Sequence, residues 1–203
     1  AAAYGEYIAG AALACNVDSL CMLTLGTGVG GGIILNRRVW HGMNGMAGEP
    51  GHGPLISQGL LCPCGARGCV EMYASATAVV RRAKELATEG AAQSLHNLLK
   101  QKPDFTARDL ATLALQGDDA AGRIFSEVGE VLGLCLANLV NILNLPLYVI
   151  GGGLAAAWPL FSPQLFRTLA ESSYVYRLTQ PKDLNVFEIC KTHVTPSLLG
   201  TGA

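Results

Sequence analysis

Residues 19–35 read SLCMLTLGTGVGGGIIL, which is an apolar run, a glycine-rich turn and a second apolar run. The first run, Ser19 to Leu25, has the length of a buried strand, and Ile33-Ile34-Leu35 reads as part of a second strand. Two strands joined by a glycine turn form a hairpin, and its turn exposes backbone N–H groups. The stretch therefore predicts a hairpin at the start of a sheet, followed by a turn at Asn36-Arg37-Arg38 and a third strand that begins at Val39-Trp40-His41.

The glycine run Gly26–Gly32 is a candidate phosphate site, because glycine lets the backbone approach phosphate oxygens and Thr27 adds a hydroxyl. No Gly-Lys-Ser/Thr follows, so the run is not a Walker loop, and a strand follows where a dinucleotide fingerprint needs a helix. A second run, Gly151–Gly153, lies between an apolar strand and a helix, where α/β sheets bind ligands. Tight turns that simply need glycine remain the alternative at both positions.

The rest of the chain alternates helical patterns with short apolar runs, which predicts an α/β fold. An irregular loop is expected over residues 42–72, and loops of that length in compact domains are usually functional. Helices are expected over residues 1–14, from the N-cap Ser75, over 91–99, from Thr106 with Asp109 in a capping box, from Asp118 or Asp119 to Ile142, from Pro159 to Ser172, and from Pro196. Further strands are expected over residues 147–150 and 185–190.

The loop carries His52, Cys62, Cys64 and Cys69, the donor set of a closed tetrahedral zinc site. The cysteines could instead pack as small apolar side chains or form disulfides. Seven cysteines are an odd number, and the chain has no secretory signal, so a disulfide scaffold is disfavoured. Four protein ligands leave no open position for a catalytic water, so the pattern predicts a structural zinc ion.

Two carboxylates flank this cluster. Glu49 lies just before His52, and Glu71 lies two residues after Cys69. Carboxylates accept hydrogen bonds from hydroxyl groups in a defined geometry, which suggests that the metal fixes a loop whose acids bind a ligand. The alternative for Glu71 is that it caps or solvates the start of a helix.

Composition narrows the class of protein. The chain has 203 residues, 50% of them hydrophobic and 14% charged, which is typical of a folded domain. A net charge of −1 argues against a nucleic-acid surface in this segment. The apolar stretches are interrupted before they reach membrane-spanning length, and the alanine-rich start lacks the basic region of a signal peptide. We therefore expect no membrane partner and a cytoplasmic location, where reduced thiols can hold a metal.

Four segments together resemble the carboxyl-terminal half of the ROK family (repressor, open reading frame, sugar kinase). They are LGTGVGGGI at 25–33, GMAGEPGH at 45–52, CPCGARGCVEMYAS at 62–75 and IGGGL at 150–154. The third segment is highly specific, and the others follow in the family's order and spacing. Pro50 departs from the pattern, because the family usually carries Ile or Leu there.

The resemblance implies the actin-like, ribonuclease-H-like sugar kinase fold, with residues 1–203 as its larger C-terminal domain and a zinc-stapled loop. ATP with Mg²⁺ would bind between two domains. Its phosphates would lie near Gly26, Thr27, Gly28 and Gly30, and its adenosine near Gly151, Gly152 and Gly153. Glu49, His52 and Glu71 resemble the family's ligands for sugar hydroxyls, with His52 also on zinc.

The resemblance further implies a glucokinase-like, ATP-dependent hexose kinase that forms a homodimer. The family's Asn-Asp-x-Asn segment, which carries the catalytic Asp, and its amino-terminal Asp-x-Gly-Gly-Thr loop have no match in this sequence. We therefore expect a fragment that lacks the N-terminal domain, has no catalytic residue and is inactive alone. The alternative is a sugar-sensing ROK repressor, which would add nucleic acid as a partner through an upstream helix-turn-helix.

Overall fold

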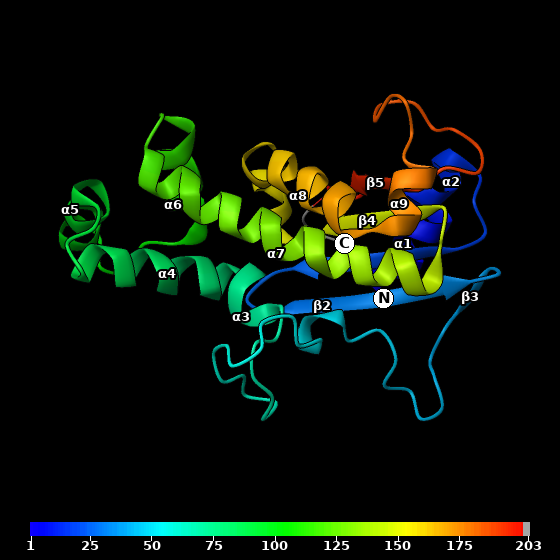
Figure 1. Ribbon diagram of the computed structural model, residues 1–203, viewed down its shortest axis with the longest axis horizontal. Helices are drawn as coiled ribbons and strands as arrows, with labels where there is room; N and C mark the ends of the chain where they lie inside the picture. The colour runs from blue at the N-terminus through cyan, green and yellow to red at the C-terminus, as the bar shows by residue number, and fades with distance from the viewer. Residues whose placement is uncertain (201–203) are drawn as a thin grey trace.

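A five-stranded mixed sheet forms the centre of the molecule in the computed structural model, which describes residues 1–200 (Figure 1). Its strands are β1 (Leu20–Leu25), β2 (Val29–Leu35), β3 (Arg38–Val39), β4 (Leu147–Gly151) and β5 (His193–Pro196), in the order β3-β2-β1-β4-β5. β2 pairs antiparallel with both β1 and β3, whereas β4 pairs parallel with β1 and β5. The hairpin expected from residues 19–35 is confirmed.

Helices surround this sheet and extend past one of its ends. They are α1 (Ala2–Ala9), α2 (Ala11–Cys15), α3 (Glu71–Ala74), α4 (Ala76–Thr88), α5 (Gln93–Gln101), α6 (Ala107–Leu115), α7 (Asp119–Leu143), α8 (Trp158–Ser172) and α9 (Tyr174–Thr179), with two 3₁₀ turns, η1 (Pro50–His52) and η2 (Gly153–Ala157). Figure 1 shows α7 and α8 running alongside the sheet, while α4, α5 and α6 reach beyond it. The α/β fold class is thereby confirmed.

Strand β1 divides its side chains between two cores, because successive residues of a strand point to opposite faces. Cys21, Leu23 and Leu25 belong to the larger core that includes α7 and α8. Leu20 and Met22 belong to a smaller core with alanines of α1 and α2. Both faces of the sheet are therefore covered, which explains why the strand reads as a continuous apolar run.

Helix starts follow the expected capping residues. The Ser75 side chain accepts a hydrogen bond from the Ala78 N–H at the start of α4. Thr106 and Asp109 form the expected capping box before α6. The Asp118 carboxylate accepts a hydrogen bond from Ala121 at the start of α7. These local interactions confirm three of the helix boundaries that the sequence indicated.

Helix α7 packs tightly against α8, because two glycines of α7 face the neighbouring backbone. A Cβ at Gly133 would lie 2.6 Å from the Thr168 Cβ and 2.7 Å from the Leu165 carbonyl oxygen. Among the described residues, α7 alone is long and apolar enough to cross a membrane, although half of its most apolar window is buried inside the protein. A core helix has the same character, and the packing on α8 accounts for its apolar side chains.

Several expectations were wrong. Residues 185–190 form no strand, since Val186 and Ile189 are 54% and 85% exposed. The edge of β4 is instead paired by β5, which ends at Pro196, so that proline does not start a helix. Residues 1–14 form two short helices separated at Gly10. Helix α9 was not expected from the sequence, and α5 begins two residues later than expected, at Gln93.

We predict that Gly133→Ala lowers the free energy of unfolding by about 1–3 kcal/mol, because the added methyl group overpacks the α7–α8 contact. The matched control is Gly122→Ala on the same helix, where a Cβ would meet nothing within 4 Å. That change should raise stability by about 0.5–1 kcal/mol through helix propensity. Urea unfolding of both variants is the measurement, and equal effects of the two substitutions would contradict the packing.

Candidate functional site

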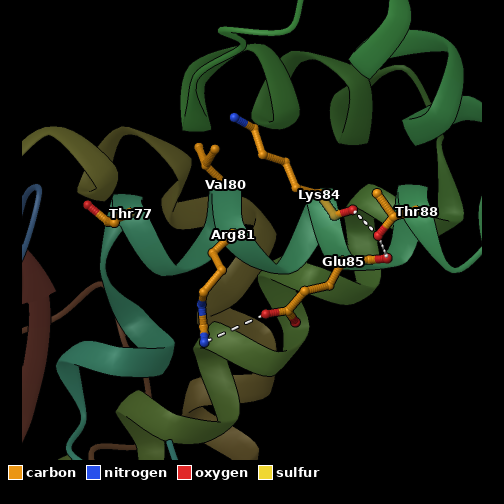
Figure 2. Close-up of a pocket in the computed structure, with 6 residues that line it drawn as sticks. All are labelled: Thr77, Val80, Arg81, Lys84, Glu85 and Thr88. Carbon is orange, nitrogen blue, oxygen red and sulfur yellow. Dashed lines mark hydrogen bonds and ion pairs between the residues drawn. The ribbon is translucent and has the colours of Figure 1, made fainter. Parts of the chain in front are cut away.

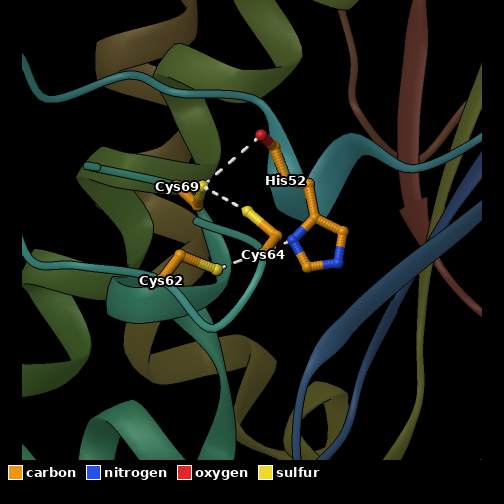
Figure 3. Close-up of side chains that lie close together, drawn as sticks. All are labelled: His52, Cys62, Cys64 and Cys69. Carbon is orange, nitrogen blue, oxygen red and sulfur yellow. Dashed lines mark hydrogen bonds between the residues drawn. The ribbon is translucent and has the colours of Figure 1, made fainter. Parts of the chain in front are cut away.

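The loop between β3 and α3 brings the four predicted metal ligands together (Figure 3). The donor atoms of His52, Cys62, Cys64 and Cys69 all lie within 4.8 Å of one another. The Cys62 Sγ lies 3.7 Å from the His52 Nδ1, and the Cys64 and Cys69 sulfurs also lie 3.7 Å apart. Figure 3 shows Nδ1 of His52 turned toward the thiols and its other ring nitrogen turned away from them.

These separations fit a tetrahedral zinc ion. Zn–S bonds of about 2.3 Å in tetrahedral geometry place two sulfurs about 3.8 Å apart, and a zinc-bound imidazole nitrogen lies slightly closer. The 3.7 Å separations match that requirement. All described cysteines are free thiols, so no disulfide competes for these sulfurs. The three thiols and the imidazole nitrogen thus form a donor set of the right chemistry, with two donor pairs at tetrahedral spacing and all four donors within 4.8 Å of one another.

The ionisation of the thiols differs across the cluster. Burial, together with hydrogen bonds to the thiols of Cys64 and Cys62, raises the pKa of Cys69 to about 12. A hydrogen bond from the backbone N–H of Ala66, followed by one from the Cys62 thiol, lowers the pKa of the exposed Cys64. Three thiolates at this distance would repel one another, and a bound divalent cation would favour their ionised forms by offsetting two of the three negative charges.

Backbone hydrogen bonds shape the loop around the cluster. Isolated β-bridges pair Pro54 with Cys69 and Leu61 with Arg67, and the Cys62 N–H donates to the Ala66 carbonyl at 2.8 Å. Gly68 has a φ of +75°, and a Cβ there would overlap with the Ile56 carbonyl. The loop therefore folds back on itself tightly, and the glycine between Arg67 and Cys69 is required for that path.

The predicted sugar ligands and the glycine turn line one cavity of about 400 Å³. Glu49 comes from the loop before η1, His52 from η1, and Glu71 from the first turn of α3. The lining residues are Thr24, Gly26, Thr27, Gly28, Val29, Gly30, Glu49, His52, Glu71 and Gly152. Segments far apart in the sequence thus meet at the end of β1, as expected for an α/β ligand site.

Glu71, which follows the cysteine loop, forms a hydrogen bond to the backbone at the end of the glycine turn. Its Oε2 accepts a hydrogen bond of 2.9 Å from the Val29 N–H, at the start of β2. A Cβ at Gly28 would overlap with that same carboxylate oxygen. Gly28 is therefore required for the approach of Glu71 rather than for an unusual backbone angle. The reading of Glu71 as a mere helix cap is insufficient, because the carboxylate bonds across 42 residues of sequence.

A second, larger cavity of about 610 Å³ adjoins the first and shares Gly26 and Thr27 with it. Its wall is mostly apolar and comes from α6, η2 and the start of α4. The remaining lining residues are Ala76, Thr106, Ala107, Arg108, Ala111, Thr112, Leu115, Gly153, Leu154, Ala156 and Ala157. An apolar cleft beside a glycine turn suits a flat base next to its phosphates.

The three glycines at 151–153 take different positions. Gly152 lines the first cavity and Gly153 the second, whereas Gly151 lies inside β4 and lines neither. Thr24 in the first cavity and Thr106 and Arg108 in the second were not expected as site residues from the sequence. A capping box was the only signal at Thr106, and it indicates a helix start rather than a binding role.

Comparison with known proteins finds relatives by both sequence and structure. A model of the ROK family matches residues 1–194. The chain is 36% identical over 202 residues to a glucokinase from Halalkalibacterium halodurans, covering 99% of this chain and 59% of that protein. The fold is similar to a ROK family glucokinase from Streptomyces griseus in complex with glucose and AMPPNP, with a TM-score of 0.80, 30% identity, and coverage of 98% and 61%.

The fold is also similar to a ROK family transcriptional regulator, a homologue of the E. coli MLC protein. The TM-score is 0.78 at 26% identity, with coverage of 97% of this chain and 45% of that one. The chain therefore spans less than two thirds of the length of each of these proteins.

We predict that Gly28→Ala lowers the free energy of unfolding by about 1–3 kcal/mol, because the Glu71 carboxylate loses its hydrogen bond to Val29. Gly26→Ala is the control, since a Cβ there meets nothing within 4 Å, and it should change stability by less than about 0.5 kcal/mol. In a Glu71→Ala background the cost of Gly28→Ala should largely disappear. If Gly28→Ala still lowers the free energy of unfolding by the full amount in that background, the Glu71 carboxylate is not the group that the added methyl displaces.

Proposed function

The chain belongs to the ROK family, and on that premise we propose that the protein phosphorylates a hexose with ATP. The observation that carries this proposal is the single cavity in which Glu49, His52 and Glu71 face the glycine turn. A kinase must place a sugar hydroxyl next to a terminal phosphate, and proximity of this kind supplies much of the rate enhancement. The similarity to a glucokinase with bound glucose and AMPPNP supports the same assignment.

Glu49, His52 and Glu71 are proposed to bind the sugar. One oxygen of Glu71 is held by the Val29 N–H, which leaves the other free to accept a hydrogen bond from a hydroxyl group. The His52 ring turns one nitrogen toward the thiols and the other away from them. A metal on Nδ1 would fix the ring plane and leave Nε2 for a sugar hydroxyl.

The nucleotide is proposed to lie across both cavities. Its phosphates would meet Gly26, Thr27, Gly28, Gly30 and Gly152 in the first cavity, and its adenosine would lie beside Gly153 in the second. Gly151 supports the neighbouring turn from within β4. When bound, Mg²⁺ would neutralise the charge that develops on the transferred phosphoryl group. We assign the role of general base to none of the described residues.

A structural zinc ion is proposed for the Cys₃His cluster. The four donors would all come from the loop that carries Glu49 and precedes Glu71. Zinc would therefore reduce the conformational freedom of the segment that presents the sugar ligands, and it would take no direct part in phosphoryl transfer.

A sugar-sensing transcriptional regulator is the second candidate, favoured by the 0.78 TM-score with a ROK regulator. A regulator of this kind would share the sugar cavity and bind DNA through a separate helix-turn-helix. ATP turnover coupled to glucose distinguishes the two, since a regulator needs the sugar site but no phosphoryl transfer.

We predict that Glu49→Gln and Glu71→Gln each weaken glucose binding by about 10-fold to 100-fold, because each removes a charged hydrogen-bond acceptor. The control is Glu130→Gln on the exposed face of α7, which should leave the affinity unchanged. Isothermal titration of the full-length protein with glucose is the measurement. Wild-type affinity in both site variants would remove the proposed sugar role of these carboxylates.

We predict about one zinc ion per chain after purification without added metal, as a Cys₃His site requires. Cys64→Ser should lose most of this zinc, because a hydroxyl group is a poor zinc ligand. Cys190→Ser is the matched control, since that thiol is also exposed but lies outside the cluster, and it should retain the metal. Elemental analysis of the two variants side by side is the measurement, and equal zinc contents would exclude the cluster as the zinc site.

A further inference from the structure

Helix α4 holds the backbone of the glycine turn through two hydrogen bonds. The Ala76 N–H donates to the Gly26 carbonyl at 2.8 Å. One residue further along the helix, the Thr77 hydroxyl donates to the Thr27 carbonyl at 2.7 Å, across 50 residues of sequence. Two consecutive carbonyl groups of the turn are therefore bonded to the first turn of α4.

This anchoring determines where the neighbouring N–H groups point. In a trans peptide, the C=O of one residue and the N–H of the next point in opposite directions. Binding the Gly26 carbonyl to α4 therefore turns the Thr27 N–H away from α4, and binding the Thr27 carbonyl does the same for Gly28. Within residues 1–200, neither N–H has a protein acceptor, and both residues line the first cavity.

The Thr77 hydroxyl is the side-chain group that completes this arrangement. Ser75 is already engaged as the N-cap of α4, where it accepts the Ala78 N–H. Among the described residues, no other side chain donates to a carbonyl group of residues 26–28. The Thr77 side chain is exposed, so its hydroxyl is not needed to satisfy a buried group. Its one visible interaction is with the turn.

We propose that Thr77 is a positioning residue, which aims the N–H groups of Thr27 and Gly28 at the phosphates of the bound nucleotide. The proposal rests on the proposed kinase function, and Thr77 itself touches neither substrate. Backbone N–H groups that are fixed before binding stabilise anionic oxygens without a reorganisation cost, which is why their orientation matters. Without the hydroxyl, the Thr27–Gly28 peptide would be free to rotate.

Helix α4 offers a matched control for this role. Thr88, near its other end, donates its hydroxyl to the carbonyls of Lys84 and Glu85 within the same helix. Figure 2 shows Thr77 and Thr88 at opposite ends of the groove along α4. Thr77→Val and Thr88→Val therefore make the same chemical change on one helix, but only the first removes a bond to the glycine turn. Thr77→Ser keeps the hydroxyl and serves as the rescue variant.

The test measures AMPPNP–Mg²⁺ and glucose affinity of the full-length protein by calorimetry, together with the backbone amide NMR signals of residues 26–28 without ligand. We expect Thr77→Val to weaken AMPPNP binding by about 3-fold to 10-fold while glucose affinity stays unchanged. The Gly26 N–H, bonded to the Gly28 carbonyl at 2.9 Å, should exchange faster with solvent. Thr77→Ser should restore both values, and Thr88→Val should change neither.

Two results would overturn the proposal: amide signals and AMPPNP affinity in Thr77→Val that equal those of the wild type, or the same losses in Thr88→Val. A wild-type protein that binds no AMPPNP would instead count against the kinase function. In that case the amide signals of the unliganded variants still decide whether the Thr77 hydroxyl orients the turn.

Discussion

Everything at this site depends on four side-chain donors of one irregular loop, which lie within 4.8 Å of one another. The loop has little secondary structure of its own beyond two isolated bridges and the η1 turn. Cys69 is bridged to Pro54, and Glu71 follows it by two residues, at the start of α3. The path of the backbone at Cys69 therefore constrains where the Glu71 carboxylate can lie, and that carboxylate accepts a hydrogen bond from the Val29 N–H.

The glycine turn is consequently held from two sides. Glu71 binds its end at Val29, and the first turn of α4 binds its carbonyl groups at Gly26 and Thr27. Because α3 and α4 are consecutive, a shift of the cysteine loop would move the glycine turn through both the Glu71 hydrogen bond and the α4 hydrogen bonds. The proposed sugar ligands and the proposed phosphate donors thus belong to one connected structure rather than to two independent pockets. This arrangement suits a reaction that must align two substrates.

The sequence predicted what depends on local chemistry. The hairpin, the caps at Ser75, Thr106 and Asp118, and the Cys₃His cluster all follow from residue type and short spacing. The exposed apolar residues near Ile189 were mistaken for a strand, because hydrophobicity alone does not show which segment can reach the edge of β4. Thr77 carried no signal either, since its partner lies 50 residues away. Long-range partners of this kind emerge only from the folded chain.

In the proposed holoprotein, one cation joins the four donors and so holds the loop in place. X-ray diffraction with anomalous scattering at the zinc absorption edge tests it most directly. We expect a single peak about 2.3 Å from the sulfurs of Cys62, Cys64 and Cys69 and about 2.0 Å from Nδ1 of His52. Crystals that show no peak between these atoms, or a disulfide between Cys64 and Cys69, would contradict it.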